Sequence, residues 1–377
     1  MTQRNRTIYN QEELYVSNIT GAAGAVGTIV PGEATVLHRI QSTSYDTNVT
    51  RVDVQEQGKL ARLGSMITEP PSVSLNFEYF LADGYNETGI GLSAATANPP
   101  NALSGILSNL ASAEKNFYVM TTQPGLDAHG VSPQSADNSF VAFGNCFLSS
   151  YNLNVAVGEI PSASTSWECS NVTIVDGAAD GFQNPAIIAT GQGTPTQYTG
   201  KVTLPLGSTG SLSVVALRPG DIVLDFGTDD LQIGGPVLPG TTSAETSTAM
   251  HVQSVSIEIP LSRTPQNKIG SAFAFSKELD VPISVTMNVS ANIADIVNGN
   301  LLDLICEEEQ PRDITLTIYD PCTSTINMKF DLKGAIFDSS SYSNAVGDNA
   351  KTVELTFSAQ MGGANDSSRG LFITKKV

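Results

Sequence analysis

Alternation of apolar and polar residues is the dominant pattern along this chain. In the segment PPSVSLNFEYFLAD (70–83), the four apolar residues from Val73 to Tyr79 alternate with polar ones. The segment PISVTMNVSANIAD (282–295) alternates in the same way. A period of two over eight residues predicts strands that are buried on one face only.

These two segments belong to a longer internal repeat. When residues 40–83 are compared with residues 252–295, an offset of 212 without a gap, 11 of the 44 positions are identical. Arg51 matches Arg263 and Gly58 matches Gly270 in this register. Shared composition does not place arginine, glycine and proline residues in one register, so we interpret the match as a duplication.

The later part of each repeat also matches, with a smaller offset. The segment GNCFLSSYNLNVAVGE (144–159) parallels GAIFDSSSYSNAVGD (334–348) at an offset of 190, which falls to 189 at the AVG triplet, so one residue is lost in the turn. Period-two patterns predict matching pairs of strands: 116–122 with 313–319, 140–148 with 329–337, and 163–169 with 353–359. Apolar stripes over 103–110 and 293–305 predict one helix in each repeat.

We therefore predict a mainly β protein with two tandem copies of a β-sandwich, each with one flanking helix. The predicted units are 1–174, a linking or inserted β-hairpin region over 175–250, and 251–377. Within the linking region, strands are expected at 200–206, 212–217 and 221–226. The strands at 72–79 and 284–291 should occupy equivalent places in two separate sandwiches. Finding both strands in one continuous sheet of a single domain would refute the duplication.

Composition and charge narrow the function classes. The chain has 19 Lys and Arg against 37 Asp and Glu, a net charge of −18. Such a surface repels polyanions and does not bind nucleic acid by counterion release. The N-terminal segment has no apolar core of signal-peptide length, and no apolar run is long enough for a membrane span. The four cysteines form no CxxC pair, so we expect free buried thiols in a reducing compartment.

The sequence contains no catalytic constellation. The three histidines, His38, His129 and His251, have neither HExxH nor HxH spacing, and no GxSxG occurs. The stretch GQGTPTQ (191–197) lacks the third glycine and the following helix of a dinucleotide-binding loop. We therefore expect no enzyme activity, no cofactor and no metal site.

Five segments, in this order along most of the chain, carry a further signal: FEYFLADGYNETGIGL, VGEIPSASTSWECSNVTI, NPAI, ALRPGDIVLDF and KIGSAFAFSKELDVPISVTMNVSA. In these segments and in the order of its features the chain resembles the tail tube protein (major tail protein) of long-tailed bacteriophages. The resemblance implies a β-sandwich flanked by a helix, in rings that stack into a hollow tube through which DNA is ejected without specific binding. It also implies assembly in the host cytoplasm, a place in the virion tail without a membrane, and other tail proteins at the tube ends.

The duplication then predicts the number of chains in a ring. Tubes of this family usually have six tube domains per ring, so three chains with two domains each would form a pseudo-sixfold homotrimer. The hairpins at 200–226 and the long loops of the first repeat are candidates for contacts between stacked rings.

Polar strand faces rich in Ser, Thr and Asn, with some Glu and little Lys, would suit the wall of a channel for DNA. The alternative is an ordinary solvent-facing side of a sheet. The candidate lumen-facing residues are Asn76, Glu78, Glu168, Glu258, Asn288 and Glu354.

Two other classes of protein remain open. One is a different virion component, such as a decoration protein or a baseplate hub, which has paired tube-like domains but forms a single ring. The other is a secreted β-sandwich binding module. Six Asn-x-Ser/Thr sequons favour this class, and the lack of a signal peptide counts against it.

Overall fold

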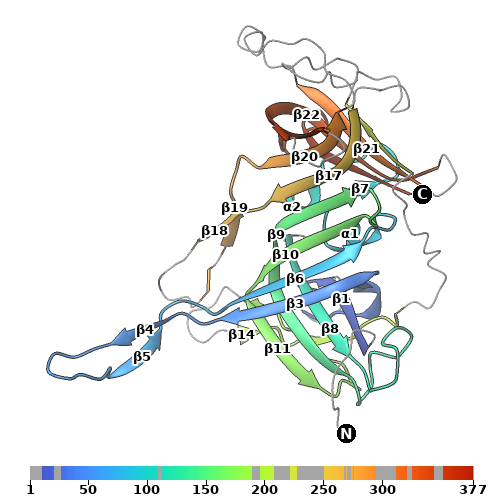
Figure 1. Ribbon diagram of the computed structural model, residues 1–377. Coiled ribbons are helices and arrows are strands. Elements are labelled where there is room, and N and C mark those ends of the chain that lie inside the picture. The colour runs from blue at the N-terminus through green and yellow to red at the C-terminus, as the bar shows by residue number, and fades with distance from the viewer. Residues whose placement is uncertain are drawn as a thin grey trace.

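A computed structural model gives the protein a mainly β fold with one dominant sheet of 16 strands (Figure 1). Within the described residues, no helix is long and apolar enough to cross a membrane. The structure describes residues 11–20, 27–108, 113–188, 196–207, 221–226, 250–266, 269, 273–274, 276–293, 311–320, 325–343 and 351–376.

Eight of these 16 strands form two series of four antiparallel strands, one from each repeat, and we call these eight the main sheet. The first series, in spatial order, is β3 (Ile40–Asn48), β6 (Ser72–Phe80), β10 (Ser162–Cys169) and the second half of β9 (Ser139–Ala156). The second series, in the corresponding order, is β17 (Met250–Pro260), β20 (Ser284–Ile293), β23 (Lys351–Gln360) and the second half of β22 (Ile326–Ser343). The strands predicted at 72–79, 163–169, 284–291 and 353–359 are confirmed.

The pairing register of the first two strands repeats at an offset of 212. Ile40 lies opposite Tyr79, and 212 residues later Val252 lies opposite Ala291. In both pairs the register shifts directly after this position, which is the signature of a β-bulge. A bulge is a local irregularity, and the alternation of residues alone does not require it to recur at the same point.

A second bulge also recurs. Trp167 lies opposite Leu148, and the equivalent Phe357 lies opposite Phe337, with a register shift beside each pair. The offset is 190 between Trp167 of β10 and Phe357 of β23, and 189 between Leu148 of β9 and Phe337 of β22. The residue that the second repeat lacks therefore precedes the position of Leu148, whereas the sequence comparison had placed the loss in the later turn. The duplication remains an interpretation, and the two repeated bulges support it.

The expectation of two separate sandwiches is wrong. The second half of β9 pairs with β17, so β6 and β20 belong to one continuous sheet. In this junction Leu153 lies opposite Ile257 and Tyr151 opposite Ile259. A shared sheet counts against duplication by the criterion stated above, whereas the repeated order, registers and bulges are independent observations in its favour.

Strands β9 and β22, each 18 residues long, connect the main sheet to a second layer. Their first halves pair with strands that cover the inner face of the main sheet: β8 (Glu114–Thr121) and β11 (Asn171–Asp176) for β9, and β21 (Arg312–Tyr319) and β24 (Gly370–Lys375) for β22. The strands predicted near 116, 140, 313 and 329 are thereby confirmed. The remaining strands of these layers are β1 (Glu12–Asn18), β2 (Ala34–Val36), β7 (Ala94–Ala95) and β16 (Ile222–Asp225).

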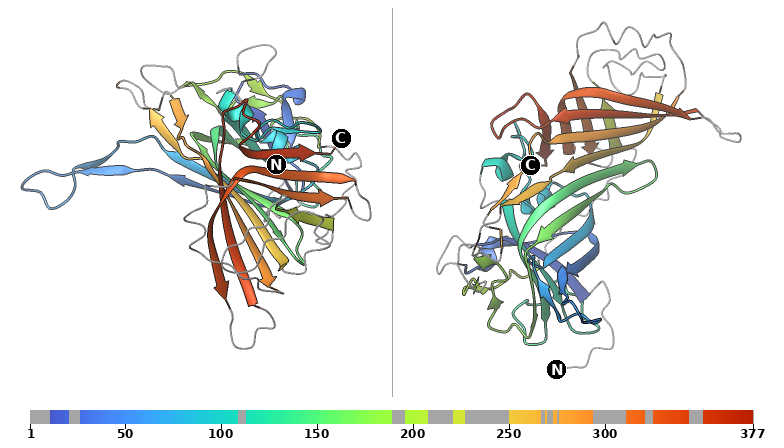
Figure 2. Two further views of the ribbon diagram at one scale, coloured as in Figure 1. Left: turned by 90° about the horizontal axis from the view of Figure 1, so that it is seen from above. Right: turned by 90° about the vertical axis from the view of Figure 1, so that its left-hand side faces the viewer.

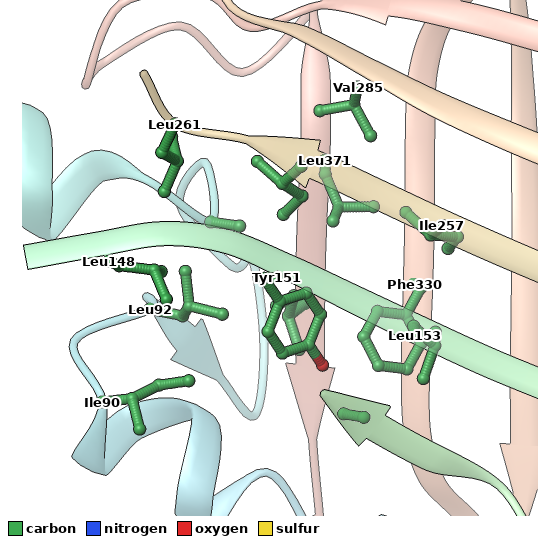
Figure 3. Packing of buried hydrophobic residues seen from close by; sticks show 14 of the residues in the cluster. Ile90, Leu92, Leu148, Tyr151, Leu153, Ile257, Leu261, Val285, Phe330 and Leu371 are labelled. Carbon is green, nitrogen blue, oxygen red and sulfur yellow. The ribbon is translucent and has the colours of Figure 1, made fainter. Parts of the chain in front are cut away.

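One hydrophobic core extends through both repeats. Figure 3 shows Tyr151 and Leu153 of the first repeat beside Ile257 and Phe330 of the second. In the first repeat, the ring centroids of Trp167 and Phe117 are 4.6 Å apart, so main sheet and second layer meet directly. The junction therefore buries side chains as well as pairing backbones.

The described part of region 175–250 contributes to both repeats rather than standing apart. Its small sheets pair β12 (Phe182–Gln183) with β15 (Lys201–Val202), and β13 (Ile187–Ile188) with β14 (Thr196–Gln197). Phe182 and Val202 belong to a second apolar cluster with the second layer of the first repeat. Strand β16 instead pairs with β21 of the second repeat. The predicted strand 212–217 lies outside the described residues. Both predicted hairpins, which would pair this strand with 200–206 and with 221–226, therefore stay predictions.

The helices are short where they are described. The stretch predicted at 103–110 contains α2 (Ser104–Ser108), and α1 (Tyr85–Gly89) forms where no helix was predicted. A 3-10 turn, η2, spans Pro31–Glu33. In the stretch predicted at 293–305, Ile293 ends β20 and the other residues lie outside the described part.

The expectation of free thiols is wrong for one pair of cysteines. Cys146 and Cys169, which are separated by 23 residues, form a disulfide between β9 and β10. The sheet brings them together, because Glu168 lies opposite Phe147 and the next residues along are the two cysteines. The other two cysteines, Cys306 and Cys322, lie outside the described residues.

We expect the double variant Cys146→Ala/Cys169→Ala to lose about 3 kcal/mol of unfolding free energy, because the cross-link restricts the unfolded chain. Denaturant titration with and without reductant measures this loss. The variant Cys306→Ala/Cys322→Ala is the matched control and should respond to reductant as the wild type does. Alkylation of Cys146 in unreduced, denatured protein would contradict the disulfide.

The first repeat contains a buried carboxyl group. Glu87 in α1 is 1% exposed, and its Oε1 accepts hydrogen bonds from the hydroxyls of Tyr79 (2.9 Å) and Tyr151 (3.3 Å). Burial raises the pKa of the Glu87 carboxyl, and the two tyrosine hydrogen bonds only partly oppose this shift. The folded state therefore retains this proton to higher pH than the unfolded state, so stability falls as pH rises through that range.

We expect Glu87→Gln to raise the melting temperature at pH 8 and to leave it nearly unchanged near pH 4, because Gln keeps the accepting oxygen without a charge. Thermal unfolding followed by circular dichroism at both pH values measures the difference. Glu87→Leu, the control, removes the acceptor for two buried hydroxyls and should destabilise at both pH values by about 2 kcal/mol. An equal effect of Glu87→Gln at both pH values would disprove the titration.

Candidate functional site

One face of the main sheet is predominantly polar on all eight strands, with the apolar Phe80 and Pro260 on it at the ends of β6 and β17. Buried residues such as Leu75, Trp167, Ile257 and Met287 face the core, so their neighbours in sequence face outward. The outward positions are Ser42, Ser44, Asp46, Asn48, Ser72, Ser74, Asn76, Glu78, Ser162, Ser164, Ser166, Glu168, Ser150, Asn152, Asn154, Ser256, Glu258, Thr286, Asn288, Ser290, Glu354, Thr356, Ser358, Ser339, Ser341 and Ser343. We call this set the polar face.

All six candidate residues lie on the polar face. Asn76 and Glu78 are on β6, Glu168 on β10, and Glu258 on β17. The other two, Asn288 and Glu354, are on β20 and β23. The Thr356 hydroxyl donates to the side-chain amide oxygen (Oδ1) of Asn288 at 3.0 Å, which confirms that neighbouring strands present these positions on one side. That this side lines a channel stays a prediction.

The charge of the polar face is negative. It carries five carboxylates and neither lysine nor arginine at the positions defined above. One cation reaches it from outside, because Lys277 Nζ lies 2.7 Å from Glu168 Oε1. Glu168 therefore differs from the other candidates: its charge is balanced within the chain.

Two hairpins that the sequence did not predict extend from the main sheet on one side (Figure 1). The first arm pairs β4 (Arg51–Val54) with β5 (Gly64–Ile67), and the second arm pairs β18 (Arg263–Gln266) with β19 (Ser276–Leu279). All four strands obey the offset of 212. The matches of Arg51 with Arg263 and of Gly58 with Gly270 were the available signal.

The second arm is attached to the first repeat at its root. The Arg263 guanidinium lies 4.9 Å from the ring centroid of Phe147, and Lys277 Nζ lies 5.3 Å from the same centroid. Such cation–π contacts contribute roughly 0.5–2 kcal/mol each. Together with the Lys277–Glu168 ion pair, they place the root of the arm over β9 and β10.

Electrostatics support this attachment. Burial lowers the pKa of Arg263, and the nearby carboxylates of Glu114 and Glu168 act in the opposite direction. Burial likewise raises the pKa of Glu114, against a hydrogen bond of 2.8 Å from the Asn145 amide. A cavity of about 350 Å³ lies between the roots of the two arms, with Thr50 and Lys277 in its lining.

The first arm has a different surface. Its large apolar side chains are exposed: Val52 (50%), Val54 (39%), Leu60 (111%), Leu63 (51%), Met66 (64%) and Ile67 (51%). Viewed from above in Figure 2, it projects far from the body of the protein. A cluster of exposed apolar side chains of this size is typical of a contact surface.

No protein-family model matches the sequence, and no curated protein matches it either. Among solved structures, a chain of the sheath–tube complex of an extracellular contractile injection system is 13% identical, with a TM-score of 0.30, and the match covers 45% of this chain and 99% of that chain. A chain of the anti-feeding prophage tube-terminating cap is 9% identical, with a TM-score of 0.27, over 42% of this chain and 91% of that one.

A chain of the anti-feeding prophage baseplate is 10% identical, with a TM-score of 0.23, over 40% of this chain and 91% of that one. At these scores the likeness carries no functional argument. Among the described residues, no group of three or more His, Cys, Asp or Glu side chains is placed to hold a metal ion.

Proposed function

We propose that this protein is a structural tail protein whose rings stack into a tube that conducts DNA. The observation that carries the proposal is the polar face, which continues from β3 to β22, while the opposite face is buried on the strands between them and partly exposed on the edge strand β3. A sheet of this kind, closed into a ring, encloses a wet and anionic channel.

The proposed ring contains three chains. Each chain supplies two repeats, and within the described residues the main sheet has two open edges, namely β3 and the second half of β22. A contact that joins different edges is heterologous, so it closes into a ring when the rotation per chain allows. Six repeats from three chains then surround the channel with pseudo-sixfold symmetry.

The chemistry of the polar face suits passage of DNA. Phosphates are repelled by carboxylates, whereas lysine or arginine would hold them by releasing condensed counterions. Hydroxyl and amide side chains keep the wall hydrated without adding positive charge. In this role Glu78, Glu258 and Glu354 line the channel with Asn76 and Asn288, and Glu168 contributes less because Lys277 balances its charge.

Negative-stain microscopy of the purified protein tests this proposal. We expect tubes, built from rings in which mass measurement finds three chains. Isolated rings that never stack would favour a baseplate hub or a cap. Monomers at high concentration would favour a decoration protein or a secreted binding module and would reject the proposal.

The triple variant Glu78→Lys/Glu258→Lys/Glu354→Lys should form tubes that retain DNA, whereas wild-type tubes should not. Added salt should release the DNA, because it screens the attraction and opposes counterion release. Co-sedimentation of tubes with labelled DNA at low and high salt measures the effect. Asp127→Lys/Asp176→Lys/Asp180→Lys adds the same charge outside the polar face. Equal retention by both variants would contradict a lumenal position of these glutamates.

A further inference from the structure

We infer that the contact between neighbouring chains repeats, strand for strand, the junction between the two repeats within one chain. This inference rests on the proposed ring and specifies its interface. The partner is a second copy of this chain, which presents β3 and the first arm to the second half of β22.

The junction inside the chain has two parts. In the first part, β17 pairs with the second half of β9 from Ser254 opposite Ala156 to Pro260 opposite Ser150. In the second part, the root of the second arm lies over Phe147 and Glu168, as described above. Together they fix both the register of the sheet and the position of the arm that leaves it.

The chain has free surfaces equivalent to both sides of this junction. Strand β3 is equivalent to β17 at an offset of 212, and it ends the main sheet. The second half of β22 is equivalent to that of β9 at an offset of 189, and within the described residues it pairs with β23 alone. Within the described residues, the chain therefore contains one formed junction, between β9 and β17, and two strand edges, β3 and the second half of β22, that could form an equivalent junction with other chains.

The exposed fractions of equivalent side chains on β17 and β3 differ as expected if β3 lacks a neighbouring strand. Ile257 of β17 is 0% exposed because β9 and the core cover it, whereas the equivalent Tyr45 of β3 is 49% exposed. Pairing β3 with a second chain would cover Tyr45 and would satisfy the row of backbone groups along this edge.

Transfer of the internal register gives specific pairs between chains. The pairs Ser256–Asn154, Ile257–Leu153, Glu258–Asn152, Ile259–Tyr151 and Pro260–Ser150 become Ser44–Ser343, Tyr45–Tyr342, Asp46–Ser341, Thr47–Ser340 and Asn48–Ser339. No two like charges meet in the transferred pairs. In this register Tyr45 and Tyr342 occupy the positions of Ile257 and Leu153.

The arm contact transfers with matching changes on both sides. Lys277 corresponds to Ser65 at an offset of 212, and Glu168 corresponds to Ser358 at an offset of 190. The ion pair within the chain is thus replaced by two serines between chains, so neither of these two positions retains an unpaired charge. Arg51, the equivalent of Arg263, is kept, and Ile336 takes the place of Phe147 beneath it.

Cysteine cross-linking tests the register. After mild oxidation of assembled Tyr45→Cys/Tyr342→Cys, a non-reducing gel should show covalent trimers and no larger product, because three links close the ring. The matched control Tyr45→Cys/Ser340→Cys shifts one partner by two residues on the same side of the strand and should link at least tenfold less. Wild-type protein controls for linkage through its own cysteines.

The outcomes separate this inference from the proposed function. Tubes in which the control pair links, or in which neither pair links, overturn the inferred register while the tube function stands. Monomers without links overturn both. Covalent polymers longer than three chains would keep the pairing and overturn the closed ring of three.

Charge variants test the arm contact without cysteines. Ser65→Glu/Ser358→Glu should weaken assembly at low salt, because two carboxylates would meet, and Ser65→Lys/Ser358→Glu should restore it. Sedimentation of assembled protein against salt concentration gives the comparison, and circular dichroism verifies that each variant is folded. Equal assembly of both variants at low salt would overturn the arm placement.

Discussion

The backbone pairing of β9 with β17 is the interaction on which the rest of the architecture depends. It converts two series of four strands into one sheet and brings the apolar residues of both repeats into one core. Since β9 is also part of the second layer of the first repeat, the same strand joins the two layers and the two repeats. A change in this register by one residue would exchange the buried and polar faces of every strand beyond it.

The alternation of apolar and polar residues predicted most of the strands, because that alternation records which face is buried. It did not predict which strands become neighbours. Asn152 and Asn154 face the polar side whether β9 is an edge strand or pairs with β17. The junction therefore produces no recognisable pattern in the sequence. The arms were missed for a related reason: their strands are only four residues long, and residues such as Val52 and Met66 stay half or more exposed instead of facing a core.

The candidate site was partly predictable on the same physical grounds. A period of two is sufficient to place Asn76 and Glu78, or Asn288 and Ser290, on one face, and the structure does so. The Lys277–Glu168 ion pair and the Cys146–Cys169 disulfide join residues that are 109 and 23 positions apart in sequence. Only the folded sheet brings such residues together, so no short sequence motif could predict either contact.

The two arms differ in sequence, and this difference limits how identical rings could be superimposed. Around a closed ring of three chains, three copies of the first arm would alternate with three copies of the second, so the outline would repeat only after one third of a turn. A sixfold arrangement of a single repeat would offer twice as many equivalent rotational positions to the next ring. In the proposed ring, two diverged repeats in one chain would therefore halve the number of equivalent rotational positions for stacking and would give a pseudo-sixfold wall a threefold exterior.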